Sequence, residues 1–287
     1  MSTKQTSNTI DYGRGKAARI RRLVHGLLLA KDAAGEIPTN GRFIFYELIQ
    51  RGDAVKPTRP GHRREKGWPP GEVDIAGGTK WLRDEKHVPW WWIADESRHL
   101  TTWAYADSVA DFLRDRLAAA TINPWGDEAP PLIICEAMAT AGVLASAVSR
   151  YCCPITGTKG FCNAHLRNDL APLFENEDRQ VLYLGDLDRS GADVEGNAQR
   201  LLGVDIPWRR LAITEKQAAK IEPTWKVDKR DKKGREAWEV ESLGQRQLVK
   251  IVTAALDKML PEPLERVLER EDEQRADAEA VLEGLGA

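Results

Sequence analysis

Two short apolar runs in the second half of the chain each end in an acidic residue. Residues 130–135 (PPLIIC) lead into Glu136, and residues 182–185 (LYLG) lead into Asp186. Continuous apolar runs of this length are typical of strands buried on both faces of a parallel sheet. A helix of small residues is expected from about 137 to 150. The pattern therefore predicts an α/β fold.

The acidic residues at these strand ends form a candidate metal site. Asp186 and Asp188 fall on the same side of an extended chain, and Gly191 permits a sharp turn into a helix. The carboxyl ends of neighbouring parallel strands face one crevice, so we expect Glu136 to join the two aspartates. Carboxylates suit Mg²⁺, with Mn²⁺ as an alternative ion. Asp, Ser and Gly after a strand are also ordinary turn residues, which leaves a structural role open.

A strand ending in Glu, a helix, and a strand ending in Asp-x-Asp resemble the Toprim pattern. Residues 208–243 follow in an order that resembles bacterial and phage relatives of the topoisomerase VI A subunit. That family, which includes the eukaryotic meiotic double-strand-break transesterase, carries a tyrosine nucleophile on a winged-helix domain ahead of the Toprim domain. The resemblance implies an α/β protein with an N-terminal winged-helix (CAP-like) domain followed by a Toprim (Rossmann-like) domain. On its last strand, Glu239 and Glu241 are expected either to form a polar edge or to add a carboxylate.

The first half of the chain contains a match to the tyrosine motif of this family. The run Arg42-Phe-Ile-Phe-Tyr46 lies on a predicted helix that Thr39 or Asn40 can cap. Tyr46 falls off the apolar stripe of that helix and shares a face with Arg42 and Gln50. The resemblance implies that Tyr46 is the nucleophile. Arg42 then either favours the phenolate or holds the scissile phosphate, and the alternative is a half-buried structural tyrosine.

Several basic residues are candidates for DNA contacts. A short helix over residues 79–83 is the recognition helix by position. Residues 88–98 resemble the segment that follows the winged helix in bacterial relatives, where an arginine either binds phosphate or pairs with an acid. A Gly-rich turn over 156–167 is either an anion site or a plain crossover. The predicted DNA-binding residues are Lys80, Arg83, Arg98, Lys159 and Arg167.

Composition agrees with a two-domain globular protein. The chain has 287 residues, of which 42% are hydrophobic and 30% charged. No apolar run is long enough for a membrane span and no signal-peptide core is present, which predicts a cytoplasmic, nucleoid-associated protein. The cysteines lack zinc spacing, and the dense tryptophans at 90–92 are expected in a core or interface.

Charge is distributed unevenly along the chain. Residues 1–66 carry 14 Lys and Arg against 6 Asp and Glu, whereas residues 261–287 carry 3 against 9. A basic front favours phosphate contacts, and the basic amphipathic helix at 16–31 fits either DNA or a packing role. The expected division is an N-terminal basic arm (1–35), a winged-helix domain (36–122), a Toprim domain (123–260) and an acidic helical tail (261–287).

The resemblance implies metal-dependent cleavage of double-stranded DNA by transesterification. Tyr46 would form a 5′-phosphotyrosyl link, Asp186 and Asp188 would hold Mg²⁺, and Glu136 would be a third ligand or the general acid. A homodimer with the tyrosine of one protomer against the acids of the other is expected, with an ATPase B-type subunit supplied separately. The alternatives are a hydrolytic Toprim nuclease, as in Wadjet plasmid defence, and a catalytically silent DNA-binding protein.

Overall fold

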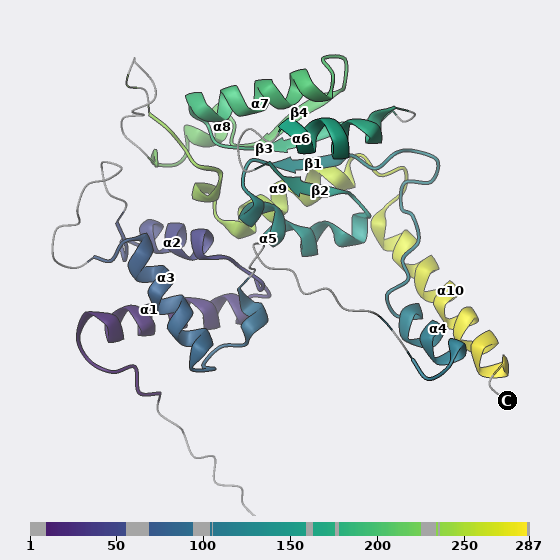
Figure 1. The fold of residues 1–287 in the computed structure, drawn as a ribbon, viewed down its shortest axis with the longest axis horizontal. Helices are drawn as coiled ribbons and strands as arrows, with labels where there is room; N and C mark the ends of the chain where they lie inside the picture. The colour runs from purple at the N-terminus through teal and green to yellow at the C-terminus, as the bar shows by residue number, and fades with distance from the viewer. Residues whose placement is uncertain are drawn as a thin grey trace, which may run out of the picture.

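The computed structural model arranges the chain as a helical group, a central sheet with its covering helices, and a C-terminal helix (Figure 1). The structure describes residues 10–55, 69–93, 104, 106–158, 163–175, 178–224, 234 and 236–285. The helices are α1 (Gly15–Ala33), α2 (Gly41–Gln50), α3 (Glu72–Asp84), α4 (Val109–Leu117), α5 (Met138–Val148), α6 (Asn163–His165), α7 (Arg189–Leu202), α8 (Glu215–Ala218), α9 (Gln245–Asp257) and α10 (Leu264–Leu285). The strands are β1 (Leu132–Cys135), β2 (Ile155–Gly157), β3 (Val181–Leu184) and β4 (Trp208–Ala212).

The sheet has four parallel strands in the order β2-β1-β3-β4. Alternate residues of β1 and β3 enter different cores, because successive side chains of a strand point to opposite faces. On one face, Ile133 and Leu182 pack with α5 and α9. On the other face, Ile134 and Tyr183 pack with α7. The prediction of a parallel α/β sheet with doubly buried strands is confirmed.

The N-terminal helices α1, α2 and α3 share a separate hydrophobic core. Asn40 caps α2, since its side-chain oxygen accepts hydrogen bonds from the backbone N–H groups of Arg42 and Phe43. The region predicted as a short helix at 79–83 belongs to the longer α3. The described residues of this group form helices and one isolated bridge between Thr39 and Ile93, so a winged-helix architecture stays a prediction.

The prediction that Glu239 and Glu241 lie on a last strand is wrong. Residues 238–243 make a single antiparallel bridge, between Trp238 and Leu187, and then a 3-10 turn η5 (Val240–Leu243). The apolar and acidic residues alternate as they would in a strand. However, the acidic side chains face α2 and α5 rather than solvent, so the alternation reflects these tertiary contacts.

The three tryptophans at 90–92 are divided between core and surface. Trp92 is buried in the N-terminal core, whereas Trp90 and Trp91 are 60% and 62% exposed. Trp92 therefore lies in a core as expected, and an interface stays a prediction for Trp90 and Trp91. The division results from a 3-10 turn, η1 (Trp90–Trp92), whose three side chains point in different directions around a tight helix.

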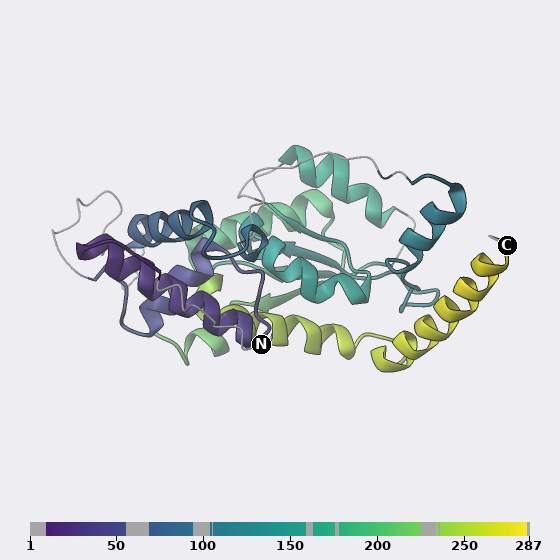
Figure 2. The ribbon, with the colours of Figure 1, turned by 90° about the horizontal axis from the view of Figure 1, so that it is seen from below.

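At the opposite end of the molecule, α10 extends beyond the sheet and packs against α4 (Figure 2). Arg275 of α10 donates to the carbonyl oxygens of Leu117, the last residue of α4, and of Ala120, which follows this helix. The predicted amphipathic tail is therefore one long helix. None of the helices in the described part of the chain is long and apolar enough to cross a membrane.

Candidate active site

The predicted acidic residues lie at the switch point of the sheet, where the direction in which successive strands are added reverses. From β1 the chain moves outward to β2, and from β3 it moves to β4 on the other side. In open α/β sheets, ligands bind in the crevice at the carboxyl ends of the two strands that flank this switch point. Glu136 follows β1, and Asp186 and Asp188 follow β3. The topology therefore brings all three acids to the crevice.

Each of the three acids also accepts a backbone hydrogen bond. Glu136 accepts from the N–H of Asp186 at 3.0 Å, which joins the two strand ends directly. Asp186 accepts from the N–H of Val240 at 2.9 Å. Asp188 caps α7 by accepting from the N–H of Gly191 at 2.6 Å. The acids therefore do have the structural role that is typical of turn residues after a strand. They also lie together at the strand ends.

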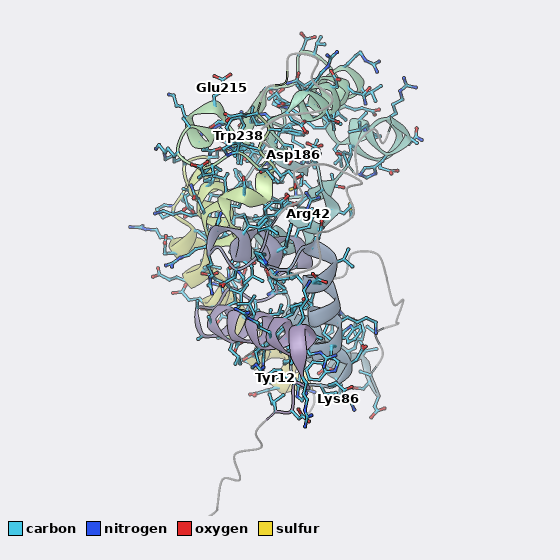
Figure 3. The ribbon with its side chains drawn as sticks, turned by 90° about the vertical axis from the view of Figure 1, so that its left-hand side faces the viewer. Tyr12, Arg42, Lys86, Asp186, Glu215 and Trp238 are labelled. Atoms are coloured by element: carbon cyan, nitrogen blue, oxygen red, sulfur yellow. The ribbon has the colours of Figure 1, made fainter. Side chains whose placement is uncertain are left out.

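Helix α2 carries Arg42 on the side of Asp186 and Trp238 (Figure 3), and the candidate tyrosine follows one turn later on the same helix. The Tyr46 hydroxyl donates to Oε2 of Glu239, 193 residues away in the sequence. One turn earlier, Arg42 pairs with the same oxygen at 2.7 Å and with Oε1 of Glu241 at 3.1 Å. One turn later, Gln50 donates to the carbonyl oxygen of Ser242. The prediction that Arg42, Tyr46 and Gln50 share one face of α2 is confirmed. This face packs against residues 239–242.

Glu239 is held beside the Asp-x-Asp segment on both sides. The preceding residue, Trp238, exchanges backbone hydrogen bonds with Leu187 at 2.8 and 3.2 Å. The following residue, Val240, donates to Asp186. Residues 238–241 therefore connect the tyrosine helix to the acids that end β3. Sequence reasoning placed Glu239 and Glu241 on a strand edge and did not identify this connection.

Burial dominates the protonation of the site. Tyr46 is 5% exposed, and burial, followed by the charge of Glu239 and its hydrogen bond, raises the pKa of the Tyr46 phenol above its ordinary value. Arg42 acts in the opposite direction but is outweighed. For Arg42 itself, burial opposes the charge, and Glu241 and Glu239 raise its pKa on balance. In the free chain, Tyr46 is therefore a neutral phenol beside a permanent cation.

The buried acids repel one another. Burial, followed by the charges of Glu241 and Glu136, raises the pKa of Asp186 well above its usual value. Burial also raises the pKa of Glu136 and that of Glu241, the latter against the effect of Arg42. A bound cation would relieve this repulsion, because it interacts favourably with every carboxylate at once.

The donor set is chemically suited to Mg²⁺, which prefers carboxylate oxygens. Glu241 is fully buried, and its Oε2 has no hydrogen-bond partner within the described residues. Its Oε1 accepts from the Thr140 hydroxyl at 3.0 Å. Within the same described residues, no three Asp, Glu, His or Cys side chains form a group that could hold an ion. The donor chemistry of the acids suits Mg²⁺, and a metal site formed by them stays a prediction.

Arg210 is a further residue that sequence reasoning missed. It lies on β4, and its guanidinium donates to the carbonyl oxygens of Gly185 and Ile213, each at 2.9 Å. It also pairs with Glu195 of α7 at 2.7 Å. Arg210 therefore fixes the loop that carries Asp186. The available signal was a pair of adjacent arginines, Arg209 and Arg210, within an expected strand.

The predicted DNA contacts are distributed over several surfaces. Lys80 is 77% exposed and pairs with Asp84 along α3. Arg83 lies over the Trp90 ring, 3.6 Å from its centroid. Arg167 is exposed on the π-helical turn η3 (Leu166–Leu170). Arg98 and Lys159 lie outside the described residues.

Comparisons of this chain with family models, with curated proteins and with solved structures found no match.

Proposed function

We propose that this chain is a metal-dependent enzyme that cleaves double-stranded DNA by transesterification, with Tyr46 as the nucleophile. One observation carries the proposal. Tyr46 and Asp186 come from two motifs that lie far apart in the chain, and both are bonded to one short segment, through Glu239 and Val240. A nucleophile, a cation and a group of acids thereby occupy one region of the fold, as phosphoryl transfer requires.

The roles of the individual residues follow from their surroundings. Asp186 and Asp188, with Glu136 as third ligand or general acid, would hold Mg²⁺. The ion would supply charge stabilisation at the phosphate and at the leaving O3′. Arg42 would hold the scissile phosphate, because a guanidinium already placed beside two carboxylates stays charged. Arg210 would keep the Asp186 loop in position.

The proposal includes the partners that the resemblance implies. DNA would lie along the basic N-terminal helices, where Lys80 is exposed. The contact between Tyr46 and Glu239 lies within one chain. We therefore propose a homodimer in which each protomer combines its own tyrosine with its own acids, in place of the expected site shared between protomers. An ATPase B-type subunit would be needed only for strand passage.

Hydrolysis by a metal-activated water is the second candidate, and the burial of Tyr46 favours it. A phenol that is 5% exposed and bonded to a carboxylate is protected from substrate in this arrangement. For Tyr46 to attack, α2 and residues 239–242 must move together to expose the phenol when DNA binds. A water nucleophile needs no such movement.

A denaturing-gel assay distinguishes the two reactions. Supercoiled DNA and Mg²⁺ or Mn²⁺ are incubated with the unaltered protein and with Tyr46→Phe, and the 5′ ends are tested for attached protein. Transesterification predicts a covalent adduct that is lost in Tyr46→Phe. The matched control is Tyr151→Phe, which removes another phenol that donates to a carboxylate, that of Asp257 at 2.7 Å, and should keep the adduct.

The remaining outcomes identify the other candidates. Free ends from both the unaltered protein and Tyr46→Phe would mean hydrolysis. Asp186→Asn should abolish cleavage by either route, because it removes a carboxylate from the proposed metal site. Salt-sensitive DNA binding without cleavage in either metal would indicate a silent DNA-binding protein.

A further inference from the structure

Glu239 contacts the candidate nucleophile, but the proposed reaction gives it no chemical role. Its Oε2 accepts from the Tyr46 hydroxyl and from Arg42. Its side chain is 16% exposed, and its backbone N–H donates to the Thr224 hydroxyl at 3.0 Å. The carboxylate is therefore oriented toward the phenol by side-chain and backbone contacts together.

We infer that Glu239 is the proton acceptor for Tyr46 in DNA cleavage, which rests on the proposed transesterification. As the Tyr46 oxygen attacks phosphorus, the bond between Oη and phosphorus forms and the bond between phosphorus and O3′ breaks. The phenolic proton moves to Glu239, along the hydrogen bond that already exists. The leaving O3′ takes a proton from water, and Glu239 returns its proton to the solvent, so that charge and protons balance.

The protonated state of the Tyr46 hydroxyl makes a proton acceptor necessary. A neutral phenol is a weak nucleophile, and it needs a base within hydrogen-bond reach. Arg42 cannot serve, because a guanidinium does not accept a proton. Glu136, Asp186 and Asp188 have no hydrogen bond to Tyr46 in the described structure, whereas Glu239 has one.

Glu239 has charged neighbours of both signs, namely the cation Arg42 and the acids Glu241 and Asp186, whose pKa values the charge of Glu239 raises. Arg42 bridges Glu239 and Glu241, contacting them at 2.7 and 3.1 Å, and a paired cation favours an ionised carboxylate. Trp238 and Val240 tie the same segment to the Asp-x-Asp loop. The base is thus carried by the same backbone that approaches the proposed metal ligands.

The test is the rate of adduct formation in a single turnover, measured across pH for the unaltered protein and Glu239→Gln. Gln has nearly the same size and still accepts the phenol hydrogen bond, but it takes up no proton. We expect adduct formation to slow by about 100-fold near pH 7, since positioned acid–base catalysis contributes roughly that much or more. The rate in Glu239→Gln should then rise with pH, because hydroxide must replace the base.

Fluorinated tyrosine at position 46 separates a base from a structural contact. A difluorotyrosine ionises more easily and needs a base less, so it should recover most of the rate lost in Glu239→Gln. Gln50→Ala is the matched control, because it removes a docking contact to Ser242 one turn away and no proton acceptor. Its rate should stay within about twofold of the unaltered protein, as expected for a contact outside the reaction.

Three results would overturn the inference. An unchanged rate and pH profile in Glu239→Gln would exclude Glu239 while leaving the transesterase intact. A loss in Glu239→Gln that difluorotyrosine does not recover would show a structural role. Cleavage by the unaltered protein without any Tyr46 adduct would remove the proposed nucleophile as well. If Glu239→Gln folds poorly, Glu239→Asp retains a carboxylate, and the rate of this variant must depend on pH as the rate of the unaltered protein does.

Discussion

Gly191 shows how closely the backbone is packed beneath the candidate site. A Cβ atom at this position would lie 2.3 Å from the carbonyl oxygen of Asp186 and 3.2 Å from Oε2 of Glu136. The turn from β3 into α7 therefore needs glycine because of contact between backbone segments. This glycine allows the strand end and the helix start to approach each other.

Gly191→Ala should lower the free energy of unfolding by about 2–3 kcal/mol, because the backbone around Asp186 must move to admit the methyl group. Denaturant unfolding measures this. The control is Gly196→Ala in the same helix, where a Cβ meets nothing within 4 Å. That change should stabilise the protein by about 0.5–1 kcal/mol through helix propensity. Equal effects at the two positions would contradict the close approach.

Asp186 should make stability depend on pH in metal-free buffer. Its folded-state pKa is raised by burial and by Glu241 and Glu136. Between the unfolded pKa, about 4, and the higher folded value, the folded chain binds more protons than the unfolded chain. The free energy of unfolding therefore falls as the pH rises through this window.

Asp186→Asn removes this titration and can keep the hydrogen bond from Val240. It should melt at a higher temperature than the unaltered protein at pH 7.5 in EDTA, and the difference should shrink toward pH 4. Mg²⁺ should raise the melting temperature of the unaltered protein and not that of the variant. A lower melting temperature for Asp186→Asn at pH 7.5 would show that the carboxylate is stabilising there.

At the scale of single elements, helix α2 positions the candidate nucleophile, and Asn40 fixes the start of this helix. Besides capping α2, Asn40 is 3% exposed and donates from Nδ2 to the carbonyl oxygen of Ala139 at 2.6 Å. The cap thus also attaches the tyrosine helix to the start of α5. Its two functions use different atoms of one amide.

Asn40→Ala should cost about 2–3 kcal/mol of stability, the sum of a lost cap and a buried hydrogen bond. Ser108→Ala is the matched control. Ser108 caps α4 by accepting from the N–H of Asp111 at 3.1 Å, in an exposed position, and its loss should cost about 1 kcal/mol or less. Thermal and denaturant unfolding of the two variants give the comparison. Similar losses would mean that the bond to Ala139 contributes little.

Local sequence patterns were sufficient to predict the elements whose side chains all meet the same kind of environment. The strands at 132–135 and 181–184 are apolar because both faces of the sheet are covered. Helix α1 follows its amphipathic pattern. The segment 238–243 has a strand-like alternation, and yet among the described residues it has no partner strand to continue the pairing beyond Leu187. A period of two is compatible with any extended segment whose alternate side chains have different partners.

At the scale of the whole molecule, α2 belongs to two cores. Phe43 packs with the sheet core, while Phe45 packs with the N-terminal core. Gln245, the first residue of α9, donates to the carbonyl oxygens of Glu36 and Pro38 at 2.9 Å each. The helical group and the sheet are therefore joined through buried contacts around α2.

These shared contacts predict that the helical group and the sheet unfold together. Hydrogen exchange measured by mass spectrometry, at increasing denaturant, should give one midpoint for α1 and β3. Phe43→Ala should lower that common midpoint, with a loss of about 3–5 kcal/mol. Two well-separated midpoints in the unaltered chain would show instead that the two cores are independent.

Some residues of the candidate site were predictable from the sequence, whereas their contacts form only when the chain folds. The acids at 136, 186 and 188 were predictable, because parallel strands place their carboxyl ends at one edge whatever else the protein does. The candidate tyrosine was predictable only through a motif and a resemblance. Its hydrogen bond to Glu239 was not, since the partners lie 193 residues apart.

Local propensity and apolar periodicity act over a few residues, so the sequence alone was enough to specify helix α1, the buried strands and the acids that follow them. Burial of Tyr46, the pairing of Arg42 with Glu239 and Glu241, and the exposure of Trp90 and Trp91 depend on which surfaces meet in space. Side-chain charge and hydrogen bonding are set by those meetings. Only the tertiary structure could therefore decide that the polar face of α2 would be buried against the residues beside Asp186.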